Sequence, residues 1–320
     1  MKKNLLLLCL FAAVWGGCRK EDNSCVSSLP ELPDPENVCS CMDDPVFAKY
    51  CYDNFDVDGN GKVSREEAAE VSQIELNVFG IYDKPVFSLK GIGYFPNLRT
   101  LYCWGNGIRS VDLSHNTELV ALALGNDQTL SQIDLYRNRK LTDMYRAFVG
   151  CSNLECVRLP ENLSEIGPFA FNDCSKLTGI NLPKSITAIG AYAFDNCSAL
   201  TGIVLPEKLS RIEPCIFFDC KQLANVTIPQ DVVYIGEFAF HGCGLTEIDL
   251  PEGVAFVGES ALDCPDLQVV RCRATTPPDV SRKLCEDKVA ARITLYVPAA
   301  SIDRYRKSDI WRNFGRIQPL

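Results

Sequence analysis

The chain has 320 residues, 47% of them hydrophobic and 23% charged, which is ordinary for a globular protein with a large core. Its net charge of −9 and its lack of a Lys/Arg run argue against a nucleic-acid partner, because nucleic-acid binders carry a basic patch. The 17 cysteines are too few for a disulfide-dense miniprotein, and no CxxC pair indicates a zinc or thioredoxin-type site.

The N-terminus has the pattern of an export signal. Residues 1–17 begin with two lysines, continue with an apolar run over 5–14, and end with two glycines. That run is shorter than the roughly 20 apolar residues that span a bilayer. The sequence Gly-Gly-Cys18 resembles a bacterial lipobox, which implies that Cys18 is acylated. The charged residues 19–22 resemble the tag of surface-exposed lipoproteins. We therefore expect an exported lipoprotein that is anchored in the outer membrane, is exposed at the surface, and contacts the membrane through its lipid anchor only.

Residues 18–42 are rich in Ser and Pro and predict a linker. Residues 43–77 change character, with helix-like apolar spacing over 43–55 and a helix-forming run over 66–76, and they predict a helical N-terminal cap. Four cysteines in these two segments are free to pair in an oxidising compartment, and the sequence does not specify their connectivity. They are Cys25, Cys39, Cys41 and Cys51.

Residues 56–67 match the EF-hand loop pattern D-x-[DN]-x-[DN]-G-x5-E. Calcium takes about six to eight oxygen ligands, and this spacing supplies them. The predicted ligands are the side chains of Asp56, Asp58 and Asn60, the Lys62 carbonyl, Ser64 through a water, and bidentate Glu67. Ala68 departs from the pattern, and only one such loop is present, whereas EF-hands usually pair. We predict a structural Ca²⁺ site; the alternative is an acidic turn without metal.

A short repeat occupies residues 90–145. Residues 98–108 fit L-x-x-L-x-C-x-x-N-x-I, the general leucine-rich-repeat signature, and residues 119–127 repeat it with Asp127 in place of the asparagine. We expect Asn106 to lie in the core with its amide bonded to backbone, because a buried amide needs partners.

A longer repeat dominates residues 146–275. Six segments share A-F-x-x-C-x-x-L-x-x-I-x-L-P followed by an apolar pair that ends in I-G. Their cysteines are Cys151, Cys174, Cys197, Cys220, Cys243 and Cys264, spaced by 23 residues four times and then by 21. Each unit is too short to bury its apolar side alone, so neighbouring units must stack. The I-x-L spacing predicts a strand, and the proline ends it.

This phrase resembles the BspA-like leucine-rich repeats of anaerobe surface proteins. The resemblance implies an α/β repeat solenoid, a leucine-rich-repeat right-handed parallel β-coil, and a surface location, but no ligand. Residues 276–320 are expected to close the coil with a strand over 293–297 and a helix over 301–314. We expect the six-cysteine column to consist of buried thiols, because parallel side chains suit disulfides poorly.

The best candidate for ligand recognition is the strand side chains that point away from the core. From the long repeats these are Arg158, Asn181, Val204, Thr227, Asp249 and Arg271, and the short repeats add Tyr102, Trp104 and Ala123. Tyr102 and Trp104 are the candidate exposed anchors. We predict a surface module that binds a protein or glycan; the alternative is an envelope scaffold without a specific ligand, and a solvated face would look the same.

Catalysis finds little support. Neither of the two histidines, His115 and His241, has an identifiable Ser or Cys nucleophile in a recognisable context. Carboxylates are scattered, and the sequence alone does not exclude a pair that the fold brings together. We expect a protein that is not an enzyme.

Overall fold

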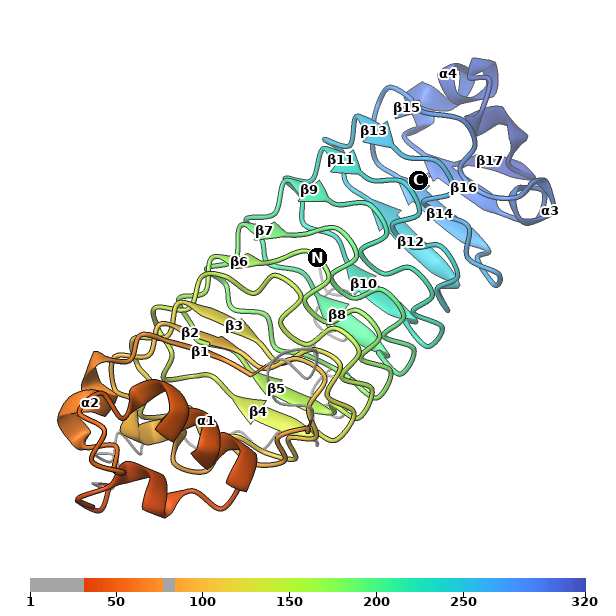
Figure 1. Ribbon diagram of the computed structural model, residues 1–320. Coiled ribbons are helices and arrows are strands. Elements are labelled where there is room, and N and C mark those ends of the chain that lie inside the picture. Colours follow the sequence, from red (N-terminus) through yellow and green to blue (C-terminus); the bar gives the residue numbers. More distant parts are fainter. Residues whose placement is uncertain (1–31, 77–83) are drawn as a thin grey trace, which may run out of the picture.

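The computed structural model describes residues 32–76 and 84–320. They form one elongated coil with helices at both ends (Figure 1). The predicted signal peptide, the lipidation residue Cys18 and Cys25 lie outside the described residues. Within the described ranges, no helix has the length and apolar character that a membrane span requires.

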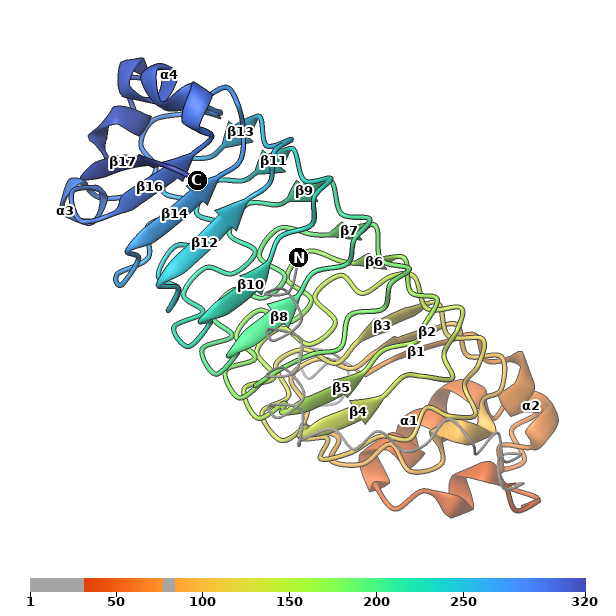
Figure 2. The ribbon, with the colours of Figure 1, turned by 180° about the vertical axis from the view of Figure 1, so that it is seen from behind.

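Strands run along two sides of the coil, which we call face A and face B. Face A carries β1 (Gln73–Glu75), β2 (Thr100–Tyr102), β3 (Ala121–Ala123), β6 (Glu165–Ile166), β7 (Ala188–Ile189), β9 (Arg211–Ile212), β11 (Tyr234–Ile235), β13 (Phe256–Val257) and β15 (Asp279–Val280). Face B carries β4 (Gln132–Asp134), β5 (Cys156–Arg158), β8 (Gly202–Val204), β10 (Asn225–Thr227), β12 (Glu247–Leu250), β14 (Val269–Cys272), β16 (Thr294–Val297) and β17 (Arg316–Pro319), seen from behind in Figure 2. All strand pairs of the described residues are parallel, which confirms the predicted parallel solenoid.

The strands of the short repeats lie on face A, in line with the I-G strands of the long repeats. Ala121 of β3 bridges to Asp143, and Arg146 in that coil donates to the Pro168 carbonyl beside β6. The prediction that aligned L-x-x-L-x-C with L-x-x-I-x-L in one column is therefore wrong. Both segments have the same strand period, and spacing within a repeat does not tell which side of the coil a strand occupies.

The N-terminal end differs from its predicted boundaries. A 3-10 helix over Val38–Cys41 packs into the core, with Val38 fully buried, so the predicted linker to residue 42 is too long. Helix α1 spans Pro45–Phe55, where the Asp44 side chain accepts from the Val46 and Phe47 N–H groups. Helix α2 covers only Arg65–Glu70, and the predicted continuation to residue 76 is wrong because β1 already begins the solenoid there. The solenoid thus starts about one coil before residue 90.

A ladder of phenylalanines fills the core of the long repeats. We call it the inner ladder, and its members are Phe148, Phe171, Phe194, Phe217 and Phe240, all fully buried. Successive rings stack with centroids 5.3 to 5.7 Å apart. This separation lies within the range of favourable aromatic pairs and close to the roughly 4.8 Å between paired strands. The A-F motif therefore repeats because every coil contributes one ring to a continuous stack.

The cysteine column runs beside this ladder as free, buried thiols, as predicted. Cys151 contacts the Leu124 carbonyl at 3.3 Å, and each of the other five sulfurs contacts a phenylalanine carbonyl oxygen of the preceding coil. The pairs are Cys174 with Phe148 (3.2 Å), Cys197 with Phe171 (3.1 Å), and Cys220 with Phe194, Cys243 with Phe217 and Cys264 with Phe240 (3.0 Å each). Burial raises the pKa of the Cys197 thiol well above its usual value, so the sulfur keeps the proton that it donates. Each of these carbonyls already accepts a backbone N–H within its own turn, as when the Cys174 N–H donates to the Phe171 carbonyl at 3.1 Å, so the thiol of the next coil is a second donor to the same oxygen.

In the short repeats, asparagine side chains rather than thiols donate to backbone carbonyls. Asn106 is buried, donates to the Leu76 carbonyl at 2.7 Å and accepts from the Val86 N–H at 2.8 Å, which confirms its predicted role. Asn138 likewise donates to the carbonyls of Leu113 and Asn116. The change from amide to thiol marks the change of repeat type.

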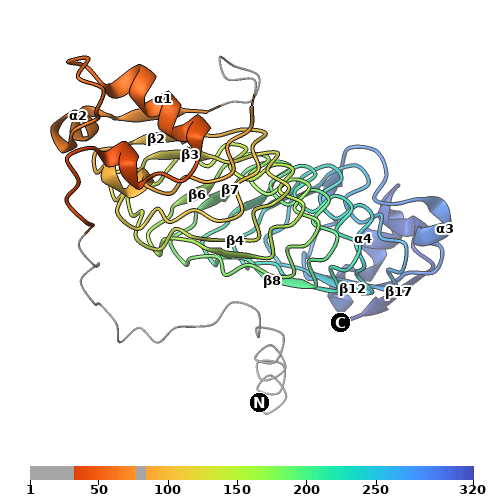
Figure 3. The ribbon, with the colours of Figure 1, turned by 60° about the horizontal axis from the view of Figure 1, so that its bottom comes forward.

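The C-terminal end covers the last coil with α4 (Ile302–Lys307), which follows β16 (Figure 3). Tyr305 donates to the Ala274 carbonyl at 2.9 Å, and Trp311 donates to the Pro278 carbonyl at 2.8 Å; both side chains are fully buried. The helix expected over 301–314 is shorter than predicted, since a 3-10 turn holds Trp311–Asn313. The sequence analysis missed β17, which pairs with β16, and α3 (Asp287–Ala290) before it.

The glycine of the I-G element fixes how closely coils approach. A Cβ on Gly236 would lie 2.5 Å from the Pro214 nitrogen of the preceding coil, well inside van der Waals contact. In one coil Glu213 stands at this position, and the hydrogen-bonded sheet of face A is interrupted there, between β7 and β9. The glycine is therefore needed for regular coil contact rather than for a turn.

We predict that Gly236→Ala destabilises the fold by about 1–3 kcal/mol, because the added methyl overpacks the contact between coils. Gly179→Ala is the matched control, since a Cβ there meets nothing within 4 Å. Urea unfolding followed by circular dichroism measures both free energies. Equal unfolding free energies for the two variants would contradict the assigned role.

Candidate calcium loop and ligand faces

The loop over residues 56–67 joins α1 to α2 at the N-terminal end of the solenoid. Gly59 and Gly61 adopt left-handed φ values of 71° and 82°, which glycine tolerates without strain. At the end of the loop, Ser64 and Glu67 form a capping box that starts α2: the Ser64 N–H donates to Glu67 Oε2 at 2.8 Å, and Ser64 Oγ accepts from the Glu67 N–H. The local fold thus follows from the same residues that were predicted to bind metal.

Three predicted ligands converge. Asp56, Asp58 and Glu67 offer oxygen atoms that all lie within 4.8 Å of one another. Backbone N–H groups orient them, with Gly61 donating to Asp56 at 2.9 Å and Val57 donating to Glu67 at 2.8 Å. A set of hard carboxylate oxygens in an open loop fits calcium well.

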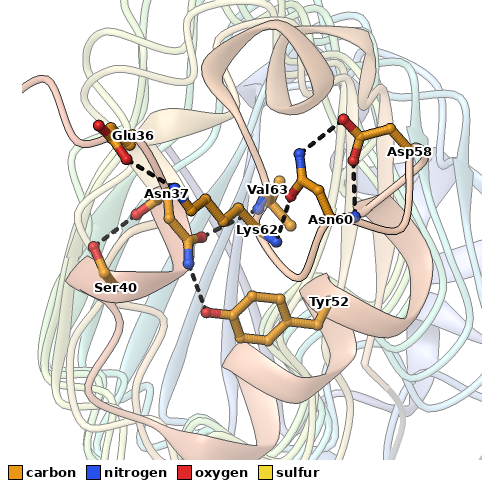
Figure 4. A network of polar contacts seen from close by, with 8 residues as sticks. All are labelled: Glu36, Asn37, Ser40, Tyr52, Asp58, Asn60, Lys62 and Val63. Carbon is orange, nitrogen blue, oxygen red and sulfur yellow. Dashed lines mark hydrogen bonds and ion pairs between the residues drawn. The ribbon is translucent and has the colours of Figure 1, made fainter.

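The other predicted ligands lie nearby with other partners. The Asn60 amide donates to Asp58 Oδ2 at 2.7 Å, and its own oxygen accepts from the Lys62 N–H at 2.8 Å (Figure 4). The Lys62 side chain forms an ion pair with Glu36. Ser64 Oγ is engaged in the capping box. Hydrogen bonds from Ser64 lower the pKa of Glu67, so this carboxylate is charged at neutral pH.

The single loop has a partner that the sequence analysis missed. The Val38 N–H donates to the Val63 carbonyl at 2.9 Å, and the Val63 N–H donates to Asn37 Oδ1 at 3.1 Å. The Asn37 amide in turn donates to the Tyr52 hydroxyl of α1 at 2.8 Å (Figure 4). Residues 37–38 therefore satisfy the backbone of the apolar anchor Val63. The only sequence signal was one valine in a stretch assigned to the linker.

Face B carries six of the nine predicted ligand-face residues, and its charges lie at its two ends. Near the N-terminal end, Arg158 pairs with Asp134 at 3.3 Å, and its guanidinium lies 4.1 Å from the centre of the Tyr136 ring. Near the C-terminal end, Arg271 pairs with Glu247 at 2.9 Å and with Asp249 at 3.5 Å.

The middle of face B is uncharged. Asn181, Val204 and Thr227 are exposed there, and Val204 and Thr227 are register partners in β8 and β10. Val204 has an exposed fraction of 51%, large for an apolar side chain. Face B is therefore an uncharged strip between two groups of ion pairs.

Tyr102 and Trp104 do not belong to this surface. Both side chains lie on the face A side and are partly buried, and Ala123 is 3% exposed. The prediction of one shared, exposed row is therefore wrong. The Trp104 ring lies over Gly125, where a Cβ would stand 3.0 Å from it. The missing side chain on the next coil gives the ring a surface to pack on. Phe87 and Tyr145 are the more exposed aromatics, at 59% and 50%.

The two histidines lie in different surroundings. His115 Nδ1 is 3.3 Å from the hydroxyl of the adjacent Ser114, in a turn where Asp112 accepts from the Ser114 N–H at 2.9 Å. His241 stacks on Phe218, with ring centroids 4.9 Å apart, and faces Asp263 at 3.6 Å. Consecutive residues in a turn differ from a hydrolase triad, in which a histidine links a nucleophile to an acid from separate segments.

Comparisons with known proteins give a family match and several similar folds. The family model described as the BspA type leucine-rich repeat region matches residues 126–273 in six copies. A leucine-rich cell surface protein of Faecalibacterium prausnitzii is 22% identical, with 62% of this chain and 61% of that chain covered and a TM-score of 0.43. A leucine-rich repeat protein of T. pallidum is 26% identical, with 60% and 80% covered and a TM-score of 0.39.

A leucine-rich repeat protein of Bacteroides ovatus is 18% identical, with 78% of this chain and 69% of that chain covered and a TM-score of 0.40. The chain thus spans 61% of the length of the Faecalibacterium protein. No curated protein matches the chain. The six matched copies coincide with the coils that share the inner ladder and the thiol column, so the chain contains a BspA-type leucine-rich repeat region.

Proposed function

We propose that this protein is a cell-surface binding module that presents face B of its solenoid to a protein or glycan ligand. One observation carries the proposal: the strands of face B alternate between buried and outward side chains, as in β12, so the outward row is held on a rigid core. A rigid row loses little conformational entropy on binding. The exposed Val204 in the uncharged middle is an apolar contact point between polar ends.

The proposed location is the outer surface of a bacterial envelope. It is supported by the N-terminal sequence, in which residues 1–17 resemble a signal peptide and Cys18 a lipidated cysteine. Such an anchor would hold the solenoid outside the membrane.

The proposed cofactor is one structural Ca²⁺ held by Asp56, Asp58, Asn60, the Lys62 carbonyl and Glu67, with Ser64 contributing through water. Calcium present at about 10 times its Kd adds roughly 1.4 kcal/mol to stability. The loop is tied to the first coil, because Tyr50 of α1 accepts from the Glu75 N–H of β1 at 3.2 Å. An ordered loop would thus help keep the first coil covered, and an uncovered solenoid end exposes apolar core.

Calorimetric titration of residues 24–320 with calcium tests this site. We expect one-to-one binding and a higher melting temperature, both lost in Glu67→Gln. Glutamine still supports the capping box, so this variant separates metal binding from helix capping. Glu66→Gln is the control, since Glu66 is an exposed neighbour outside the ligand pattern. The calcium proposal fails if neither heat nor a melting shift appears at millimolar calcium.

A pair of exposed valines tests the ligand face. We predict that Val204→Glu weakens binding at least about tenfold, because it places a charge in the uncharged strip. Val233→Glu is the matched control, with 46% exposure on the face A side, and should leave affinity unchanged. Arrays of immobilised glycans and surface proteins, followed by titration of any hit, provide the measurement. An envelope scaffold without a specific ligand predicts no saturable hit, and equal loss in both variants would remove face B as the site.

A further inference from the structure

A third side of the solenoid, where each coil turns from face A toward face B, carries a second regular column. We call it the outer column, and its members are Arg146, Phe169, Tyr192, Cys215 and Phe238. All five adopt left-handed φ values between 53° and 59°. Each coil bonds to the next at this level, as when the Phe169 N–H donates to the Ala191 carbonyl and the Tyr192 N–H to the Pro214 carbonyl, both at 3.1 Å.

Aromatic side chains are unexpected in this conformation. A left-handed backbone costs a bulky L-residue about 1–2 kcal/mol, and glycine would avoid that cost. The core does not require the rings, because the inner ladder already fills it. Instead the rings of Phe169 and Tyr192 are partly exposed and stack on each other, with centroids 4.8 Å apart and planes 6° apart.

The aromatic surface continues into the following coils. The Phe218 ring packs edge to face with the Phe238 ring, with centroids 6.4 Å apart, and it stacks on the His241 ring, with centroids 4.9 Å apart. All three side chains are partly exposed. Between the two aromatic groups, Cys215 contacts Tyr192. The column therefore forms a strip of ring surface along four successive coils.

Carboxylates line this strip. The Asp195 N–H donates to the Tyr192 carbonyl at 3.3 Å and closes a turn, so Asp195 lies three residues after the Tyr192 ring in the same coil. Asp173 and Asp219 occupy the turns of the coils before and after, and Glu237 precedes Phe238. Asp173 accepts from the neutral amide of Asn196 at 2.7 Å, and Asp195 accepts from that of Asn172 at 2.9 Å.

Among the described residues, none of Asp173, Asp195, Asp219 and Glu237 forms an ion pair, unlike the carboxylates of face B. Burial, together with the charges of Asp173 and Asp219, raises the pKa of Asp195 to about 6. The strip therefore carries four carboxylates that form no ion pair among the described residues.

The chain itself shows which group fits beside these rings. The guanidinium of Arg146 lies 5.3 Å from the centre of the Tyr145 ring and 5.3 Å from that of Phe169, at the start of the column. Cations are attracted to the faces of aromatic rings and to carboxylates, and arginine favours this combination. Beyond Phe169 the column offers rings and carboxylates but no further cation of its own.

We propose that the outer column and its four carboxylates form a docking strip for an extended protein segment that carries arginine and lysine. From Phe169 to Phe238 the strip spans three coil steps, or about 14 Å, which four to five extended residues would cover at about 3.3 Å each. The strip is separate from face B and does not depend on the function proposed for that face.

The crowded carboxylates have a consequence for stability. Because the pKa of Asp195 is raised in the folded chain, folding disfavours its charged form, and stability falls as pH rises from about 4 through about 6. We predict that Asp195→Asn raises the melting temperature at pH 7 and leaves it unchanged at pH 3.5. Thermal melts at the two pH values measure this difference, and an unchanged melting temperature at pH 7 would contradict the crowding.

The docking proposal is tested by fluorescence anisotropy with labelled synthetic peptides and the chain of residues 24–320. The probe is an Arg-Gly repeat of six residues; Gln-Gly and Glu-Gly repeats are the neutral and acidic controls. We expect saturable binding of the basic peptide only. Asp195→Asn/Asp219→Asn should weaken it at least tenfold, and Tyr192→Ser should weaken it with the charge unchanged.

The control variant Asp231→Asn/Glu207→Gln removes two exposed carboxylates outside the strip and should bind normally. The face variant Val204→Glu should also bind normally, so failure of the strip and failure of face B remain distinguishable. Melting curves confirm that each variant is folded. Equal affinity loss in both double variants, binding of the neutral peptide, or no saturable binding of the basic peptide would overturn the proposal.

Discussion

The structure depends on the stacking of coils at the spacing of paired strands. That spacing brings the rings of the inner ladder into contact at 5.3 to 5.7 Å and places each cysteine sulfur near a carbonyl of the preceding coil. It also excludes a side chain at Gly236, whose Cβ would overlap the coil before it. Because each coil contacts only its neighbours, every feature of one repeat becomes a column along the whole solenoid. The surfaces of the protein are therefore rows, and each row belongs to one side.

Much of this could be predicted from the sequence. The period of 23 residues, the cysteine column and the I-x-L strands follow from residues whose apolar spacing has one physical explanation. The side on which a strand lies could not be predicted, because both faces use the same alternation of apolar and polar residues. Tyr102 and Trp104 were therefore placed in a row with Arg158, whereas they lie on face A.

The ends were harder to predict than the middle. Residues 37–41 lack a helical or strand period, yet Val38 is buried because it pairs with Val63, which lies 25 positions later in the chain. Helix α2 stops at Glu70 because the following residues pair with β2. Strand β17 depends on β16 in the same way. Such long-range pairings leave little trace in local composition. In contrast, the residue spacing in the loop over 56–67 predicted which carboxylates lie close together, because the pattern fixes their positions in the loop.

The three sides of the rod have different chemistry. Face B has an uncharged middle between ion pairs, and face A carries packed aromatics beside glycines. The turn side joins half-exposed rings to carboxylates that accept from asparagine amides and form no ion pair among the described residues. A crystal structure of residues 24–320 grown in calcium tests the account most directly. The account predicts an ion in the loop with oxygen ligands at about 2.3–2.6 Å, and Tyr102 and Arg158 on different sides of one continuous stack. A loop of this shape without an ion, or both residues on one face, would contradict it.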